Sequence, residues 1–301
     1  MSILVDEDTR VLVQGITGAL GRTDTRLCLE YGTSIVAGVT PGRGGSEVEA
    51  VPVFDTVAEA VNATGATAAV QYVPSQAATS ATLEAVESGL SPIVAIAENL
   101  PRHDALRACD AARSHGLVLV GFNTNGLISA GKTKLGGIGG ARANELFPPG
   151  RIGVCSRSGG MAVEICAALA RRGFGVSTCV SMGGEATTGR TMTEYVLLFE
   201  ADDDTDAIVV FGEPGTDNEG DLATAIAESK IAKPVVAMVV GDFQDAYEWG
   251  TSFGHISAMA QQEEERSVVK RQLLQDAGAQ IALRTEEIPA ILTKIGKEGS
   301  R

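Results

Sequence analysis

Short apolar runs alternate with longer alanine-rich amphipathic stretches along the chain. In the first 121 residues the apolar runs predict strands, and three of the stretches between them predict helices. The expected strands are Arg10–Gln14, Ser34–Gly38, Ala68–Val73, Ile93–Ala97 and Leu117–Gly121, and the expected helices are Val57–Thr64, Ala77–Ser88 and Asp104–Ser114. Strands that alternate with helices predict a parallel sheet covered on both faces.

A second series of the same kind follows. Its expected strands are Ile152–Cys155, Val176–Ser181, Ala207–Gly212, Val235–Gly241 and Gln280–Leu283, and its helices are Met161–Arg172, Met192–Ala201, Leu222–Ser229 and Glu264–Ala277. A glycine-rich segment between the two series ends in Phe147-Pro148-Pro149-Gly150, which disfavours a helix or a central strand. We therefore expect two doubly wound α/β domains, 1–126 and 151–301, joined by a linker at 127–150.

Composition and charge narrow the class of protein. The 301 residues are 44% hydrophobic and carry a net charge of −14, which argues against nucleic acid or an anionic membrane as partner. Helix N-termini and single arginines can still bind a small anion. The five cysteines form no CxxC pair or metal spacing, and no leader or membrane span is evident, so we expect a reduced, cytoplasmic protein with buried thiols. The acidic runs at 202–204 and 263–265 are expected to be solvated surface.

The segment Ser156-Arg157-Ser158-Gly159-Gly160 lies where an apolar run turns into a helix. Two hydroxyls and two glycines at a helix N-terminus favour an anion, because backbone N–H groups and the helix dipole point at it. The loops 182–185 and 212–216 also follow strands, so all three should gather at one sheet edge. Glu213 in the third loop could hydrogen-bond an imidazole, or it could cap the next helix.

His255 lies in a glycine-preceded loop after another apolar run. An imidazole that reaches the same edge could take a phosphoryl group cradled by Ser156, Ser158, Gly159 and Gly160, with Glu213 setting its tautomer. The combination predicts phosphohistidine chemistry. The other histidines, His103 and His115, flank an expected surface helix and are expected to be solvated.

The first domain opens with a GxxGxxG loop, residues 15–21, directly after the first strand. Such glycines let a phosphate approach the start of a helix, although a tight turn without a ligand is an equal alternative. The second strand lacks the acidic residue that an NAD ribose requires. It ends instead in Val39-Thr40-Pro41-Gly42-Arg43, whose single cation suits a phosphate.

In this order, the motifs resemble the α subunit of succinyl-CoA synthetase over nearly the whole chain. The segments Pro52–Phe54, Tyr72–Pro74, Lys233–Val235 and Gly254-His255 add to the resemblance. It implies a Rossmann-like CoA-binding domain, a flavodoxin-like ligase domain, and nucleotide-driven ligation of a carboxylate to CoA through acyl phosphate and phosphohistidine. It also implies a separate ATP-grasp β subunit that binds ATP or GTP with Mg²⁺.

The resemblance assigns residues to each ligand. It implies His255 and Glu213 as catalytic residues, and it places the phosphate and the acid at Ser156, Ser158, Gly159 and Gly160. It implies no metal site in this chain. The implied CoA-binding residues are Gly15, Thr17, Gly18, Gly21, Val39, Pro41, Arg43, Tyr72, Val73, Pro74, Glu98 and Asn123.

Several positions depart from the family pattern. Ser-Gly-Gly-Met at 158–161 resembles ATP-citrate lyase and citryl-CoA synthetase, and it implies room for an acid larger than succinate, such as malate or citrate. Ile256-Ser257 stands where the family has Ala-Gly, and the segments 22–24 and 121–126 also differ. A ligase with a non-CoA acceptor and a non-catalytic acyl-CoA-binding module therefore stay open, although the retained Ser156, Ser158, Glu213 and His255 argue against the second.

Overall fold

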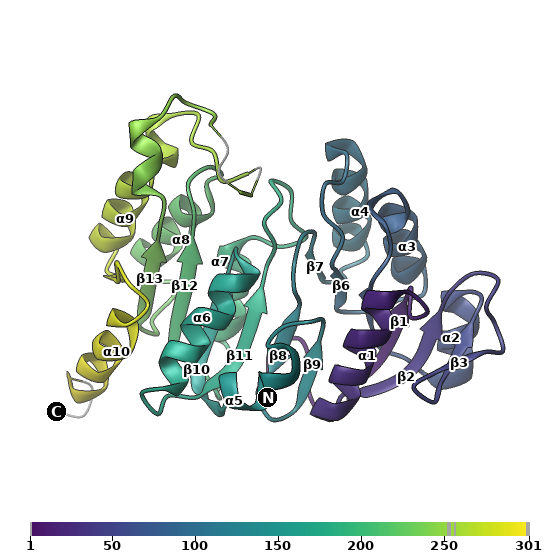
Figure 1. The fold of residues 1–301 in the computed structure, drawn as a ribbon. Coiled ribbons are helices and arrows are strands. Elements are labelled where there is room, and N and C mark those ends of the chain that lie inside the picture. The colour runs from purple at the N-terminus through teal and green to yellow at the C-terminus, as the bar shows by residue number, and fades with distance from the viewer. Residues whose placement is uncertain (1, 252–253, 256, 299–301) are drawn as a thin grey trace. The chain divides into compact units, whose positions relative to one another are not determined.

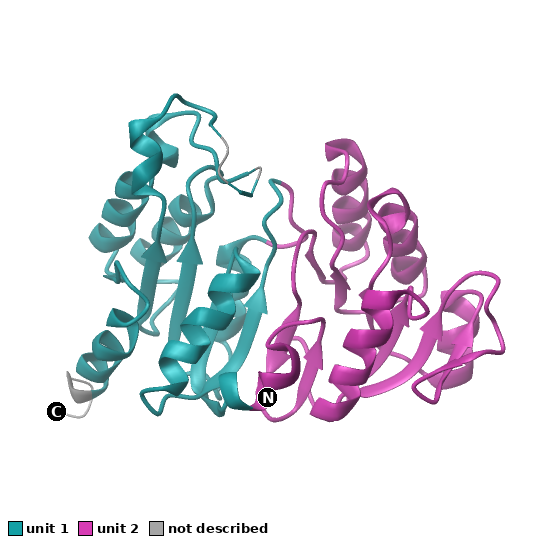
Figure 2. Cartoon of the chain, viewed as in Figure 1, with its two compact units in different colours: residues 1, 145–186, 191–301 teal, residues 2–144, 187–190 magenta. Residues whose placement is uncertain are grey.

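The computed structural model describes residues 2–251, 254–255 and 257–298, and it divides into two compact units (Figures 1 and 2). Unit 2 consists of residues 2–144 and 187–190, and unit 1 consists of residues 145–186 and the described residues from 191 onward. Each unit is built from parallel strands connected mostly by helices, so the predicted α/β class is confirmed.

Unit 2 contains the first series of elements (Figure 1). Its strands are β1 (Arg10–Gln14), β2 (Ser34–Val39), β3 (Glu47–Val48), β4 (Val51–Phe54), β5 (Ala68–Gln71), β6 (Ile93–Ala95), β7 (Leu119–Gly121), β8 (Leu127–Ser129) and β9 (Thr133–Leu135). Its helices are α1 (Ala19–Tyr31), α2 (Val57–Thr64), α3 (Ser75–Glu87), α4 (Arg102–Ser114) and the 3₁₀ turn η1 (Gly140–Arg142). Helix α5 (Ala143–Leu146) lies where the two units divide.

The sheet of unit 2 has the Rossmann order. Parallel strands run β4-β2-β1-β5-β6-β7, and β3 adds antiparallel to the β4 edge. Among the parallel strands the order by chain position is 3-2-1-4-5-6, which reverses between β1 and β5. Ligands of such sheets bind at the carboxyl ends of the two strands that flank the reversal.

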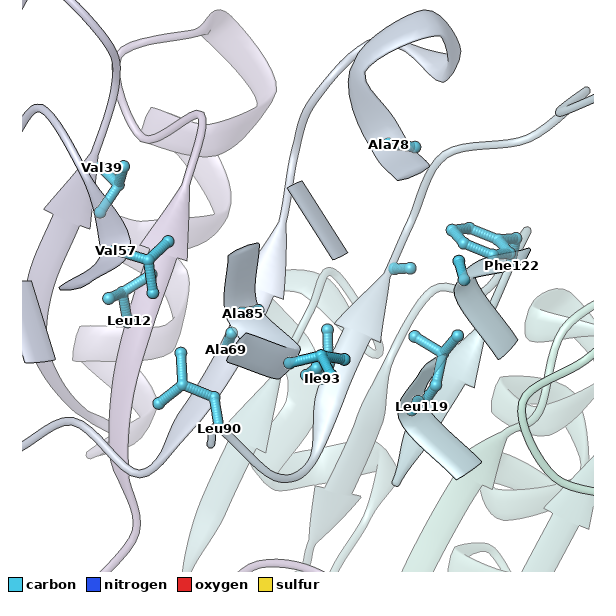
Figure 3. Close-up of a cluster of buried hydrophobic side chains, with 14 of the residues drawn as sticks. Leu12, Val39, Val57, Ala69, Ala78, Ala85, Leu90, Ile93, Leu119 and Phe122 are labelled. Atoms are coloured by element: carbon cyan, nitrogen blue, oxygen red, sulfur yellow. The ribbon is translucent and has the colours of Figure 1, made fainter. Parts of the chain in front are cut away.

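A core of small and branched side chains fixes the helices of unit 2 on this sheet. Leu12, Ala69 and Ile93 from the strands pack against Val57 and Ala85 from the helices (Figure 3). Alanines on α3 and α4 let these helices approach the strands closely, and all of these side chains are buried. The packing of these helices thereby holds the strands of the sheet in place.

Unit 1 contains the second series. Its strands are β10 (Pro149–Ser156), β11 (Val176–Ser181), β12 (Ala207–Gly212), β13 (Val235–Val239) and β14 (Gln280–Ile281). Its helices are α6 (Gly159–Ala170), α7 (Met192–Glu200), α8 (Asn218–Ala227), α9 (Ser267–Asp276) and α10 (Glu287–Glu298), with 3₁₀ turns η2 (Asp242–Ala246) and η3 (Glu263–Glu265). The parallel order β11-β10-β12-β13-β14 is 2-1-3-4-5, the flavodoxin order, and it reverses between β10 and β12.

The segment between the two series differs from its expected form. Strand β10 begins at Pro149 and pairs with strands on both sides, although the prolines were expected to exclude a central strand. Proline is tolerated there because it is the first residue of the strand. Residues 127–150, the expected linker, contain β8, β9, η1 and α5. The limits 1–126 and 151–301 stay our prediction for separately folding domains.

All five cysteines are free and buried, as their surroundings in the sequence predicted. Burial raises the pKa of Cys28 and of Cys109 to about 11, and it raises the pKa of Cys155 and Cys179 further still. These four thiols are therefore protonated at neutral pH. Within the described residues, no helix is both long and apolar enough to span a membrane.

Candidate active site

The start of α6 lies at the strand-order reversal of unit 1. Ser156 ends β10, and Ser158 is the N-cap of α6, its Oγ accepting the N–H of Met161 at 3.4 Å. The Ser156 Oγ donates to the carbonyl of Ser158 at 2.6 Å. The first turn of α6 holds no acidic residue, whereas the first turns of α2, α4, α7 and α8 each carry at least one. This helix terminus therefore keeps its full attraction for an anion.

His255 and Glu213 meet at the neighbouring strand end. The His255 Nδ1 lies 2.8 Å from the Glu213 Oε2, and the two side chains are 26% and 11% exposed. Hydrogen bonding to Glu213 raises the pKa of His255, while burial and the charge of Arg157 act in the opposite direction. Because the carboxylate accepts the proton on Nδ1, the neutral imidazole carries its lone pair on Nε2.

A buried ion pair between Lys270 and Glu219 binds the backbone of Glu213. Lys270 Nζ donates to Glu219 Oε2 at 2.6 Å, to the Glu213 carbonyl at 2.8 Å and to the Gly215 carbonyl at 2.6 Å. The Glu213 N–H donates to Glu219 Oε1 at 3.2 Å. Both charged side chains are almost fully buried, and removing one partner of such a pair costs about 3–5 kcal/mol. The loop after β12 is therefore fixed, and the Glu213 carboxylate lies against the His255 imidazole.

Two glycines let the His255 loop approach the sheet edge. A Cβ on Gly184 would lie 2.7 Å from the His255 Cδ2, and a Cβ on Gly215 would lie 2.1 Å from the Ser257 carbonyl oxygen. Gly215 also has φ +70°, which disfavours any other residue. Gly184 and Gly215 are thus explained by the close approach of the loop that carries the imidazole.

The structure adds residues to which the sequence pattern gave no role. Arg157 is 1% exposed, and its Nε lies 3.8 Å from the Glu213 Oε2. Ser257, two residues after His255, is also buried. An arginine between two serines, at the point where an apolar strand turns into a helix, was the available signal for the first. No feature of the sequence indicated the burial of Lys270, because a lysine on a helix normally has a solvated side chain.

The expected CoA-binding residues follow the strands of unit 2 at a single edge. The loop 15–21 follows β1, and 72–74 follows β5, so these two flank the strand-order reversal. The segment 39–43 includes the end of β2, Glu98 lies after β6, and Asn123 lies after β7. The parallel order therefore brings the sequence-predicted positions to the edge where a ligand binds.

Close backbone contacts partly explain why the GxxGxxG loop requires glycine. A Cβ on Gly15 would lie 2.3 Å from the Tyr72 carbonyl oxygen, and one on Gly21 would lie 2.4 Å from the Gly15 carbonyl oxygen. Gly18 is the N-cap of α1, which has no side-chain cap and no acid in its first turn. Thr17 Oγ1 donates to Thr40 Oγ1 at 3.2 Å. The glycines serve the turn itself, and the uncapped helix start fits an anion.

The remaining predicted residues differ in exposure. Pro41, Arg43, Pro74 and Glu98 are exposed, Val39 is buried, and Val73 is half-buried. The hydroxyl of Tyr72 is buried, and burial raises its pKa. Asn123 has φ +57°, and its N–H donates to the Ala97 carbonyl at 2.9 Å.

In the segment 22–24, which departs from the family pattern, Arg22 and Asp24 have different surroundings. Arg22 Nε donates to the Thr17 carbonyl at 3.0 Å, so this cation lies against the glycine loop. Asp24 is 7% exposed, and burial raises the pKa of its carboxyl. Among the residues that the structure describes, no group of three or more His, Cys, Asp or Glu side chains could hold a metal ion.

Comparison with known proteins decides the family. Residues 6–99 match the CoA binding domain, and residues 149–293 match the succinyl-CoA ligase like flavodoxin domain. The chain is 40% identical to the succinate–CoA ligase [ADP-forming] subunit alpha 2 of Archaeoglobus fulgidus, over 98% of this chain and 100% of the relative. The chain belongs to the succinate–CoA ligase α-subunit family. This family confirms the predicted acid–thiol ligase class and supports CoA as the ligand of unit 2.

Two further members of this wider group differ in the acid that they handle. The malate–CoA ligase subunit alpha of Methylorubrum extorquens is 36% identical, over 94% of both chains. The structure of Methanosaeta concilii ATP citrate lyase with (3S)-citryl-CoA has a TM-score of 0.89 and 26% identity, over 98% of this chain. The present chain covers 52% of the length of that lyase chain.

Proposed function

We propose that this chain is the α subunit of an NDP-forming carboxylic acid–CoA ligase, in which His255 carries the phosphoryl group between the nucleotide and the acid. The observation that supports this most directly is the 2.8 Å contact between His255 Nδ1 and Glu213 Oε2. It leaves Nε2 as the nucleophile of the neutral ring, in a loop held to the turn that begins α6.

Both phosphoryl transfers of the proposed reaction use groups of unit 1. The Nε2 lone pair of neutral His255 attacks the terminal phosphorus of the nucleotide, and the nucleoside diphosphate leaves. The Glu213 carboxylate offsets the positive charge that the phosphorylated ring carries. A carboxylate oxygen of the acid then attacks that phosphorus, which regenerates neutral His255 and gives an acyl phosphate. Attack of the CoA thiolate on the acyl carbon forms the thioester and breaks the bond to phosphate, which leaves.

The α6 N-terminus serves the phosphoryl group in this scheme. Ser156, Ser158, Gly159 and Gly160 surround a helix start without an acidic residue in its first turn. Hydroxyls and backbone N–H groups there would stabilise the equatorial phosphoryl oxygens, and positioning with charge stabilisation supplies most of the rate in such transfers.

The partner follows from the relatives, which are named as α subunits. We propose a β subunit with an ATP-grasp site that binds ATP or GTP with Mg²⁺. The test combines this chain with candidate β subunits and ATP labelled in the γ position. Acid-labile label on this chain and formation of an acyl-CoA are expected only in the complex. Strong NDP-forming activity of this chain alone would exclude the proposed division of labour, and absence of label with every partner would favour the non-catalytic acyl-CoA-binding module.

The acid is proposed to be a di- or tricarboxylate, with malate and citrate ahead of succinate. A Cβ on Gly160 would have only the Ser158 Oγ within 4 Å, at 4.0 Å, so the space beside the helix start is open. Gly160→Thr is therefore expected to shift kcat/KM toward succinate by about tenfold, since pocket volume discriminates by about 1–3 kcal/mol. The measurement compares the three acids in the reconstituted complex, with Gly296→Thr at an exposed position of α10 as control. A wild-type preference for succinate of more than about tenfold over both other acids would remove the basis for this prediction.

Arg43 is proposed to bind a phosphate of CoA, because its exposed side chain is a cation in the loop beside β1. Arg43→Ala is expected to raise the KM for CoA about tenfold or more, as a charge-assisted hydrogen bond is worth about 1.5–3 kcal/mol. The KM values for acid and nucleotide should stay unchanged. Arg26→Ala is a matched control, since it removes an exposed arginine that pairs with Glu30 on α1. Equal changes in all three KM values would instead indicate a folding defect.

A further inference from the structure

The guanidinium of Arg157 is buried and contacts more than one loop of unit 1. Its Nη1 donates to the Thr216 Oγ1 at 3.0 Å, and its Nη2 donates to the Ser257 Oγ. Its Nε lies 3.8 Å from the Glu213 Oε2. One cation therefore joins the turn after β10, the loop after β12 and the loop that carries His255.

Ser257 connects Arg157 to the loop after β11. Its Oγ accepts from Arg157 and donates to the carbonyl of Gly184, the glycine that lies against the His255 ring. A glycine at position 257, as in the Gly-His-Ala-Gly pattern, has no hydroxyl for either bond. The departure from the family pattern at this position therefore creates a specific attachment for the loop.

We propose that the hydrogen bond from Arg157 Nη2 to Ser257 Oγ is a latch that holds the His255 loop on the sheet edge, so that Nδ1 stays on Glu213 while Nε2 gains and loses the phosphoryl group. The inference rests on the proposed role of His255. Arg157 and Ser257 are positioning residues in this arrangement, because they act through the loop and through Glu213.

The geometry explains why arginine is required at position 157. Its planar fork places two N–H groups on two hydroxyls at once, while its charge lies beside the Glu213 carboxylate. A lysine would keep the charge but could not reproduce the fork. The charged groups that act on His255 are Glu213, Arg157 and Glu185, so a variant that keeps all three charges tests the latch separately from the electrostatics.

The first test measures His255 in the full chain without turnover. The chain has three histidines, so the ring resonance of His255 can be assigned with His255→Asn and titrated by NMR. Ser257→Ala and Arg157→Lys are each expected to lower the pKa of His255 toward its ordinary value, because the Glu213 contact becomes intermittent. Thr251→Ala is the matched control, since it removes an exposed hydroxyl that bonds the Glu248 carbonyl within the same loop.

The second test measures phosphorylation of the chain in the complex with its β subunit. Ser257→Ala and Arg157→Lys should each slow single-turnover labelling about tenfold or more, the value of a hydrogen bond to a charged group, with little change in the KM for CoA. The effect of the double variant should be smaller than the product of the two single effects, because both variants remove the bond between Arg157 and Ser257.

Two results would overturn the latch. One is a Ser257→Ala chain whose His255 pKa and labelling rate both match the wild type. The other is a double variant in which the two effects multiply, since that indicates independent roles. If the wild-type complex incorporates no label, the proposed function fails, but the NMR titration still decides whether Ser257 and Arg157 hold the ring on Glu213.

Discussion

Replacing His255 with asparagine is expected to abolish phosphoenzyme formation and acyl-CoA synthesis by the complex. The amide has no lone pair that can replace Nε2, so the loss should reach about 10⁴-fold or more, as for other covalent nucleophiles. The side chain is a quarter exposed and lies in a loop, so unit 1 should stay folded. The measurement is acid-labile label on this chain, with thermal unfolding to verify the fold.

His103→Asn and His115→Asn are the matched controls. Both side chains lie at the ends of α4 and are exposed, as the sequence predicted. Each control should keep full labelling. Acid-labile phosphate on the His255→Asn chain would show that another residue is the carrier and would refute the assignment.

Glu213→Gln is expected to shift the midpoint of the pH dependence of phosphorylation to lower pH and to reduce the maximum rate. The neutral ring is the nucleophile, so the wild-type rate rises with pH through the pKa of His255, which the Glu213 carboxylate raises. Without that charge, burial and Arg157 still lower the pKa, so the midpoint should shift to lower pH. The plateau should fall about 10²-fold or more, because the charge on the phosphorylated ring loses its counter-charge.

The measurement is the single-turnover labelling rate as a function of pH. Glu185→Gln is the matched control, since Glu185 also raises the pKa of His255, with a smaller effect than the hydrogen bond that Glu213 accepts. It should shift the midpoint slightly and leave the plateau unchanged. A Glu213→Gln plateau equal to the wild type, or a midpoint at higher pH, would show that Glu213 does not have the proposed role.

The sequence predicted the order of buried elements well. The ends of β1, β11, β12 and α2 agree with the predicted limits, because each apolar or alanine-rich run stops at a polar or glycine residue. The sequence predicted no limits for α1 and α10, and it did not predict the short strands β3, β4, β8 and β9. Helix α1 buries Asp24 and Thr25 while Leu20 is 55% exposed, so burial along this helix does not follow the apolar character of its side chains.

The candidate site was predictable where a motif carried the chemistry and not where tertiary packing decided. The meeting of His255 and Glu213 follows from strand order, which the alternation of elements implied. The buried charges do not follow: α9 buries Lys270 while Val268 and Leu273 are exposed, the reverse of the usual pattern. Asp202 shows the same limit, because the acidic run was expected to be solvated, yet its carboxylate is buried on Thr205.

The burial of the five cysteines has a consequence for an enzyme that makes thioesters. An acyl-CoA exchanges its acyl group with any accessible thiolate, so a reactive cysteine would acylate the protein itself. Burial keeps the thiols out of reach, and the raised pKa values of Cys28, Cys109, Cys155 and Cys179 keep these four as thiols. The chain can thus handle an activated acyl group without offering it a competing sulfur nucleophile of its own.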